Sequence, residues 1–112
     1  MNTQDMQQTV TEVSRLMKVL SSENRLMILC QLVEGEKSVG TLAGLLGMRD
    51  ASMSQQLSLL RKDGLVATRR EGQAIYYALA RDDVAQLMRF LYDTYCSANR
   101  QNEETVDNDT RP

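Results

Sequence analysis

The chain has 112 residues, of which 42% are apolar and 25% are charged, so it is long enough for one folded domain and has the composition of a globular protein. Its net charge is only −2, and no apolar run approaches the length of a membrane span, so we expect a cytoplasmic protein without membrane contact. Because the sequence has no histidine and only two cysteines, we expect no bound metal or cofactor and no enzymatic activity.

Two amphipathic helices are predicted at the start of the chain. Apolar residues recur every three or four positions from Met6 to Leu20, which gathers them on one helical face. Ser21 and Ser22 can then cap a second helix, which is rich in apolar residues and ends near Gly35. We expect the second helix to be largely buried, whereas the apolar stripe of the first helix needs cover from another surface.

A pair of short helices follows. Ser38 can cap the first of them, and Gly47 is the residue type favoured just past a helix end. The second runs from Asp50 to Lys62, with Asp50 as its expected cap and its apolar side chains facing inward. Since only a tight turn separates the two, they predict a helix-turn-helix.

The apolar pattern then changes from helical to alternating. Residues 65–70 and 74–79 are typical of two strands, and a turn at residues 71–73 joins them, so the segment predicts a β-hairpin. Asp82 or Asp83 can cap a last helix, whose apolar residues again form one stripe.

Four helices, a hairpin and a closing helix describe a winged helix-turn-helix domain, of the mainly helical α+β class, over residues 1–99. Residues 100–112 are polar and acidic, and we expect them to form a disordered tail. In such a domain the second helix of the pair enters the DNA major groove, and the hairpin, or wing, reaches the flanking backbone. The local charge agrees, since residues 49–71 carry five basic and three acidic residues in a chain that is acidic overall.

The outward side of the predicted fourth helix carries hydroxyl and amide groups. Glutamine can pair with adenine through two hydrogen bonds, so we expect Gln55 and Gln56 to read bases and Ser52 to bind a base or a phosphate. A merely polar solvent face is the alternative, and the adjacent basic hairpin favours DNA. Phosphate contacts are expected from Arg61, Arg69 and Arg70. The predicted DNA-binding set is completed by Ser54, Ser58 and Gln73.

Four segments in order, LMILC at 26–30, SVGTLA at 38–43, MSQQLSLLR at 53–61 with GLV at 64–66, and RREGQAIYY at 69–77, together resemble the ArsR/SmtB family of bacterial repressors. The resemblance covers roughly residues 10–98. It implies a homodimer, formed mainly through the first and last helices, that binds an imperfect palindrome in double-stranded DNA and blocks transcription. The apolar stripe of the first helix and Phe90, which lies off the stripe of the last helix, fit this implied interface.

The sequence departs from the family at the start of the fourth helix. Members commonly have a capping serine followed by Gln-Ser, and a histidine after Ser-Gln, whereas this chain has Arg49-Asp50-Ala51 and Gln56 at those places. An acidic group near phosphates repels them, so we expect Asp50 to change the choice of operator or to weaken DNA binding.

The resemblance also indicates what the protein senses. Metal-sensing members carry Cys-x-Cys in the third helix or Asp and His ligands in the last one, and this chain has neither pattern. A cysteine in the second helix, Cys30, and one late in the last helix, Cys96, resemble the sulfide-responsive and biofilm- or virulence-associated subgroup. For this chain the resemblance implies an intrasubunit disulfide or polysulfide between the two thiols that lowers DNA affinity, with reactive sulfur species or oxidants as inducers.

Two other interpretations of the cysteines stay open. In the first, the same DNA-binding fold is constitutive or regulated by a partner, and Cys30 is a small apolar residue of the core. In the second, the protein is a thiol enzyme or redox carrier, against which the lack of a Cys-x-x-Cys motif and of histidine both count.

Overall fold

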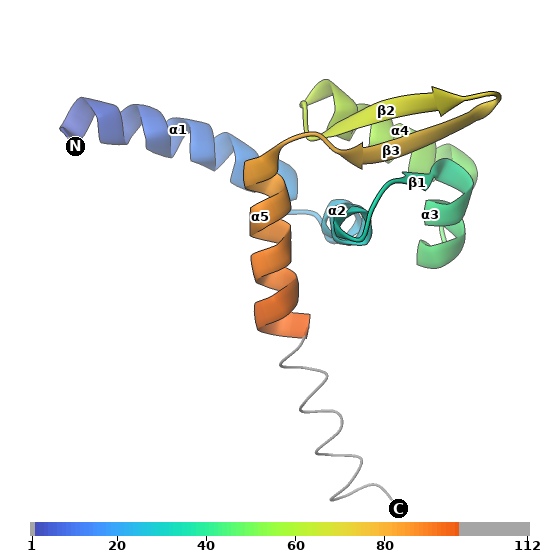
Figure 1. Ribbon diagram of the computed structural model, residues 1–112. Helices are drawn as coiled ribbons and strands as arrows, with labels where there is room; N and C mark the ends of the chain where they lie inside the picture. Colours follow the sequence, from blue (N-terminus) through green and yellow to red (C-terminus); the bar gives the residue numbers. More distant parts are fainter. Residues whose placement is uncertain (1, 97–112) are drawn as a thin grey trace, which may run out of the picture.

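The computed structural model describes residues 2–96 as helices around a small antiparallel sheet (Figure 1). The expected tail at residues 100–112, and with it the domain boundary at residue 99, lies outside the described residues. The elements in chain order are α1 (Thr3–Leu20), α2 (Glu23–Val33), β1 (Lys37–Ser38), α3 (Val39–Leu46), α4 (Asp50–Lys62), β2 (Val66–Glu71), β3 (Ala74–Leu79), α5 (Asp82–Leu91) and the π-helical turn η1 (Tyr92–Cys96). No helix within residues 2–96 is long and apolar enough to span a bilayer.

The serine caps and the glycine stop expected from the sequence are confirmed. The Ser22 hydroxyl accepts a hydrogen bond from the backbone N–H of Arg25 at 3.4 Å, at the start of α2. The Ser38 hydroxyl accepts one from the N–H of Thr41 at 3.1 Å, at the start of α3. Gly47 ends α3 with a φ of 65°, in the left-handed region where a side chain is disfavoured. The end of α3 at Gly47 sets the start of the tight turn between α3 and α4.

The caps expected from aspartates are wrong. Asp50 is the first residue of α4, and Arg49 occupies the cap position without a side-chain hydrogen bond to the helix. Arg81 likewise precedes α5, while Asp83 lies within the first turn and accepts a hydrogen bond from the N–H of Val84 at 2.9 Å. An acidic group is favourable in a first turn because the helix dipole is positive there, so these aspartates fit their helices without capping them.

The first and last helices differ from expectation at their ends. α1 begins at Thr3 rather than Met6, because the Asn2 side chain accepts a hydrogen bond from the N–H of Asp5 at 2.9 Å and caps a turn without apolar residues. Beyond Leu91 the last helix continues as η1, whose wider i→i+5 turns carry the chain to Cys96.

The sheet contains one strand more than the predicted hairpin. Its order is β1-β3-β2, all antiparallel, and the added strand β1 pairs Lys37 with Tyr77. Strand β2 extends to Glu71, so the turn of the wing is shorter than expected and consists of Gly72 and Gln73, with a φ of 62° at Gly72. The short strand β1 therefore fastens the segment before α3 to the wing.

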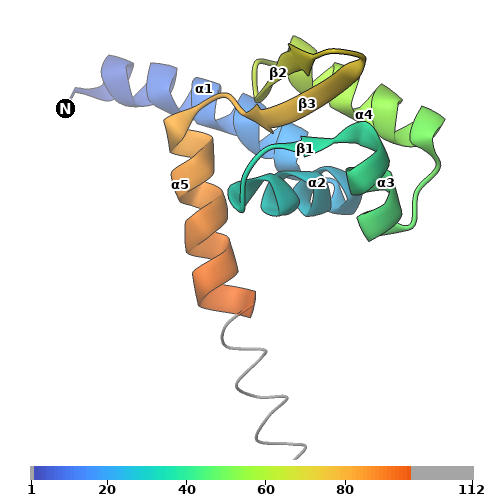
Figure 2. The ribbon, with the colours of Figure 1, turned by 45° about the vertical axis from the view of Figure 1, so that its right-hand side comes forward.

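The core lies between the sheet and the helices (Figure 2). In both views α1 and α5 lie at one end of the molecule, whereas α3, α4 and the wing lie at the other. Of α1, only Leu20 is fully buried. The buried residues are Leu20, Ile28, Leu29, Leu32, Leu42, Ala43, Met53, Leu57, Leu60, Leu65, Val66, Tyr77, Val84 and Met88. The winged helix-turn-helix arrangement expected from the sequence is thus present, with α4 held on this core.

Candidate nucleic-acid interface and thiol pair

The outer face of α4 is polar because its inner face anchors the helix. Met53, Leu57 and Leu60 are completely buried, as the sequence predicted. On the opposite side Ser52 and Gln55 are exposed and three residues apart, so their side chains lie on one stripe of the helix. Short polar groups on a rigidly held helix are able to reach base edges in a major groove.

Sequence reasoning missed one residue of this face. Leu59 is four residues after Gln55 and therefore on the same stripe, and it is 44% exposed. The signal was available, since Leu59 breaks the apolar spacing that buries its neighbours Leu57 and Leu60. An exposed apolar side chain between amides and hydroxyls is able to contact the methyl group of thymine.

The two glutamines expected to read bases differ in placement. Gln55 is exposed, whereas Gln56 is half-buried at the flank of α4. The side-chain oxygen of Gln56 is buried and has no hydrogen-bond partner among the described residues. In this conformation the structure presents only Gln55 for pairing with a base. The remaining α4 residues of the predicted set, Ser54, Ser58 and Arg61, are exposed.

The wing arginines project from opposite faces of the sheet, because neighbouring residues of a strand alternate. Arg70 and the turn residue Gln73 are exposed. Arg69 pairs with Tyr76 across the strands, and its guanidinium carbon lies 4.9 Å from the centre of the Tyr76 ring. The structure therefore distinguishes Arg69 from Arg70, for which the sequence analysis predicts the same role.

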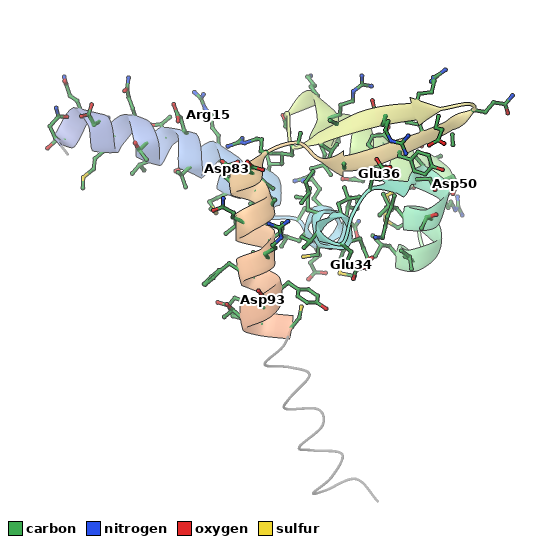
Figure 3. All side chains as sticks on the ribbon, viewed as in Figure 1. Arg15, Glu34, Glu36, Asp50, Asp83 and Asp93 are labelled. Atoms are coloured by element: carbon green, nitrogen blue, oxygen red, sulfur yellow. The ribbon has the colours of Figure 1, made fainter. Side chains whose placement is uncertain are left out.

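Carboxylates surround Arg69. Its Nε lies 3.1 Å from both oxygens of Glu36, and its Nη1 donates to Glu71 at 2.7 Å. The hydrogen bonds to Glu36 and then to Glu71 raise the pKa of Arg69 further above its ordinary value, and the hydrogen bond from Arg69 lowers the pKa of Glu36. Figure 3 shows Glu36 beside the wing and Asp50 at the start of α4, both far from α1. This end of the molecule thus carries acidic as well as basic groups.

The two cysteines are free thiols on neighbouring elements. Cys30 is half-buried on α2 and packs against the core, and Cys96 is exposed at the end of η1. The helices α2 and α5 contact one another. Burial raises the pKa of Cys30, and electrostatic repulsion from Cys96 raises it further. The structure thus places one thiol on α2 and the other at the end of η1, which continues α5, the helix that contacts α2.

A second face exposes apolar side chains. Four residues of α1, spaced as in a coiled-coil seam, are exposed to between 44% and 60%, and on the last helix Phe90 and Tyr95 are each 60% exposed. The α1 residues are Met6, Val10, Val13 and Met17. Apolar area of this extent is unusual for a free surface and is typical of an interface.

Within residues 2–96 no cluster of three or more histidine, cysteine, aspartate or glutamate side chains could hold a metal ion. An open hollow of about 360 Å³ lies between α1, the segment that joins α4 to β2, and Arg81 before α5, and charged side chains line it, among them Glu12, Arg15, Asp63 and Arg81. Figure 3 shows Arg15 on α1 and Asp83 at the start of α5, close to this region.

Comparison with known proteins gives a consistent family. Residues 22–68 match the family described as bacterial regulatory protein, arsR family. The chain is 44% identical over 101 residues to the biofilm growth-associated repressor of Xylella fastidiosa strain Temecula1, covering 90% of this chain and 89% of the relative. It is 40% identical over 100 residues to the transcriptional activator HlyU of Vibrio cholerae, covering 89% and 93%.

Solved structures agree with the fold. The repressor BigR from Xylella fastidiosa superposes with a TM-score of 0.79 at 43% identity, covering 87% of this chain and 96% of that one. The winged helix-turn-helix domain of Mb0332 from Mycobacterium bovis, described as homodimeric and DNA-binding, superposes with a TM-score of 0.68 at 34% identity, covering 84% and 87%.

Proposed function

Because the chain belongs to the ArsR family of bacterial regulatory proteins and is a transcriptional regulator of that type, we propose that it is a homodimeric repressor controlled by its two thiols. It binds a palindromic operator in the cytoplasm and leaves the DNA when Cys30 and Cys96 become bridged. The observation that carries the DNA-binding part is the exposed polar stripe of α4 on a completely buried inner face.

In the proposed complex α4 lies in the major groove. Gln55 and Ser52 reach base edges, and Leu59 contacts a thymine methyl group where the operator offers one. Phosphate and sugar contacts come from the residues that flank this stripe and from the wing. These are Ser54, Gln56, Ser58, Arg61, Arg70 and Gln73, and Arg69 lies next to Arg70 on β2.

The partner is a second copy of the chain. The apolar stripe of α1 and Phe90 on α5 both stay exposed in one copy. Packing of these helices around a two-fold axis removes both from water, and a similar domain, that of Mb0332, is described as homodimeric. The two-fold axis places the two α4 helices about one turn of DNA apart, which requires a palindromic site.

Repression follows from occupancy of the promoter. A small dimer that covers operator DNA hinders the polymerase sterically, without any further contact. One relative is named as a repressor and another as an activator, so the direction needs its own test. Deletion of the gene is expected to raise transcription from the bound promoter, whereas a fall would make the protein an activator.

Binding itself is tested with the full chain and the DNA upstream of its own gene. We expect a complex of one dimer per site, weakened as salt rises because phosphate contacts release counterions. A monomer in solution, or binding that is equal for all DNA sequences, would overturn this part of the proposal.

The proposed switch uses the different exposure of the thiols. The thiolate of exposed Cys96 attacks the outer sulfur of a persulfide, R–S–SH, which forms Cys96–S–SH and releases the thiolate R–S⁻. The Cys30 thiolate then attacks the Cys96 sulfur and expels HS⁻, which leaves a Cys30–Cys96 disulfide. Two thiols are oxidised by two electrons, and the persulfide is reduced to a thiol and hydrosulfide. If a second persulfide first converts Cys30 into Cys30–S–SH, the terminal sulfur of that group attacks the Cys96 sulfur and expels HS⁻, which gives a trisulfide bridge.

A bridge affects DNA binding because it joins α2 to the end of the last helix. α2 packs against α3, which leads into α4, while α5 belongs to the proposed dimer interface. A covalent link between α2 and η1 therefore changes the spacing of the two α4 helices, and the coupling is reciprocal, so bound DNA disfavours the bridge.

The thiol variants test this switch. In Cys30→Ser and Cys96→Ser the reduced proteins are expected to bind the operator as the wild type does, and a persulfide donor is expected to release only the wild type. Release of both variants would return Cys30 to the role of a core residue, which its packing against the core favours as the second candidate, with regulation by other means.

A further inference from the structure

Arg69 spans the outer face of the three-stranded sheet. Its own strand is β2, its ring partner Tyr76 is on the central strand β3, and its carboxylate partner Glu36 directly precedes β1. Glu36 is 33 positions away in the sequence, yet both of its oxygens lie 3.1 Å from Nε of Arg69, and Nη2 also donates to it. One guanidinium therefore connects the two strands that lie on opposite sides of β3.

This connection matters because β1 has only two residues and few backbone hydrogen bonds of its own. The planar guanidinium is suited to a two-point contact with a carboxylate, and stacking on the Tyr76 ring limits its rotation. Glu71, two residues along β2, holds the remaining edge through Nη1. The group is thus fixed by three side chains from three strands or their ends.

Arg70 has the opposite surroundings. Alternation along β2 places it on the other face of the strand, where its guanidinium is exposed. In the described part of the chain it forms no ion pair, whereas Arg69 is paired with two carboxylates. A phosphate approaching Arg69 meets the charge of both acids, while one approaching Arg70 meets a free cation.

We propose that Arg69 and Glu36 form a clamp that positions the wing, and that of the two wing arginines only Arg70 contacts a phosphate. Arg69 is a positioning residue, which acts on DNA through the placement of its neighbours. The second half of this inference rests on the proposed DNA binding, but the clamp itself does not.

The direction in which Glu36→Gln changes operator affinity distinguishes a clamp from a phosphate contact by Arg69. In Glu36→Gln the clamp loses its charge, so operator affinity is expected to fall, by about threefold for a lost surface ion-pair network. If Arg69 instead binds phosphate, the same substitution frees it and the affinity rises. Glu34→Gln is the matched control, because it also removes one negative charge from this turn, but Glu34 pairs with Lys37 at 3.7 Å and not with Arg69. The operator affinity of this variant is expected not to fall.

The salt dependence gives a second readout. Arg70→Ala is expected to reduce the slope of log affinity against log salt by about 0.9 for each wing of the dimer. Arg69→Ala is expected to weaken binding without changing this slope. The double variant Arg69→Ala/Glu36→Gln is expected to bind the operator no more weakly than Arg69→Ala alone. A slope that falls equally in Arg69→Ala and Arg70→Ala would overturn the proposal.

Hydrogen exchange tests the clamp without DNA. Amides that pair β1 with β3 are expected to exchange faster in Glu36→Gln and Arg69→Ala than in the wild type or in Glu34→Gln. Unchanged exchange in both clamp variants would overturn the clamp. If the wild type fails to bind any operator, the proposed function fails, and the exchange rates still decide whether the clamp exists.

Discussion

The two ends of the molecule each contain an amphipathic helix, but the two helices differ in whether their apolar face is buried. α4 buries its apolar face completely and presents hydroxyls and amides, so one chain suffices to build its surface. α1 buries only Leu20 and exposes its apolar stripe, so that surface is incomplete in one chain. A polar surface on a helix whose apolar face is buried indicates a charged or polar ligand. An amphipathic helix whose apolar face is exposed indicates contact with a second protein surface.

The two cysteines lie on different helices, one associated with each of these ends. Cys30 belongs to α2, which contacts α3, and Cys96 belongs to the end of the last helix, on the side of the proposed interface. A bond between them therefore connects the helix-turn-helix end of the molecule to the proposed dimer interface. The first two predictions each disrupt one end and leave the other intact, and the last two concern the thiols and the helix-turn-helix.

The largest effect is expected at the incomplete end. Val10→Glu places a charge in the middle of the exposed apolar stripe, so the dimer should dissociate and operator affinity should fall on the order of 100-fold, since two linked half-site contacts become independent. Light scattering and operator titration measure the two effects. Gln8→Glu, on the polar side of α1, is the control and is expected to change neither.

The next effect is expected on α4. Gln55→Ala removes a two-point base contact, which should lower operator affinity by about tenfold and relax the preference at one base pair in each half-site. Gln56→Ala is the comparison, because the side-chain oxygen of Gln56 is buried, and it should leave the base preference unchanged. Equal loss of preference in both variants would mean that the flank of α4 also enters the groove.

A smaller effect concerns thiol reactivity. Burial and Cys96 raise the pKa of Cys30, so less of it is thiolate at neutral pH, and its reactivity should increase as the pH rises through and above the ordinary range of thiols. Alkylation followed by intact mass in Cys96→Ser and Cys30→Ser compares the two thiols one at a time. Cys30 should react more slowly, and faster alkylation of Cys30 than of Cys96 would contradict the order of attack.

The smallest effect concerns the cap that sets the helix-turn-helix. Ser38→Ala removes the hydrogen bond to the N–H of Thr41 and should lower the free energy of unfolding by about 1 kcal/mol, measured by urea titration. Ser58→Ala, exposed within α4, is the control for stability. A loss of stability that is the same in both would mean that the cap contributes nothing specific.

Features that depend on neighbouring residues could be predicted from the sequence. The caps at Ser22 and Ser38, the stop at Gly47 and the inward stripe of α4 each follow from residues within one or two helical turns. The exposed polar face of α4 follows as well, because a buried stripe fixes the direction of the residues opposite to it. The pairing of the thiols came from the resemblance to a family and was not derivable from spacing.

Features that depend on residues distant in the sequence could not be predicted. Strand β1 exists because β3 offers it an edge, and its two residues carry no pattern of their own. The partner of Arg69 is 33 positions away, so local charge assigned Arg69 to phosphate without revealing Glu36. The inward turn of the Gln56 oxygen depends on packing around α4, and the aspartates before α4 and α5 match the composition of a cap without its geometry.

The most direct test of the account measures operator affinity and intact mass on the same sample, before and after a persulfide donor. The account predicts that reduced protein binds tightly and that protein whose mass shows a Cys30–Cys96 bridge, by loss of two hydrogens or by gain of sulfur atoms, binds about 5- to 150-fold more weakly. Bridged protein that binds as tightly as reduced protein would contradict it.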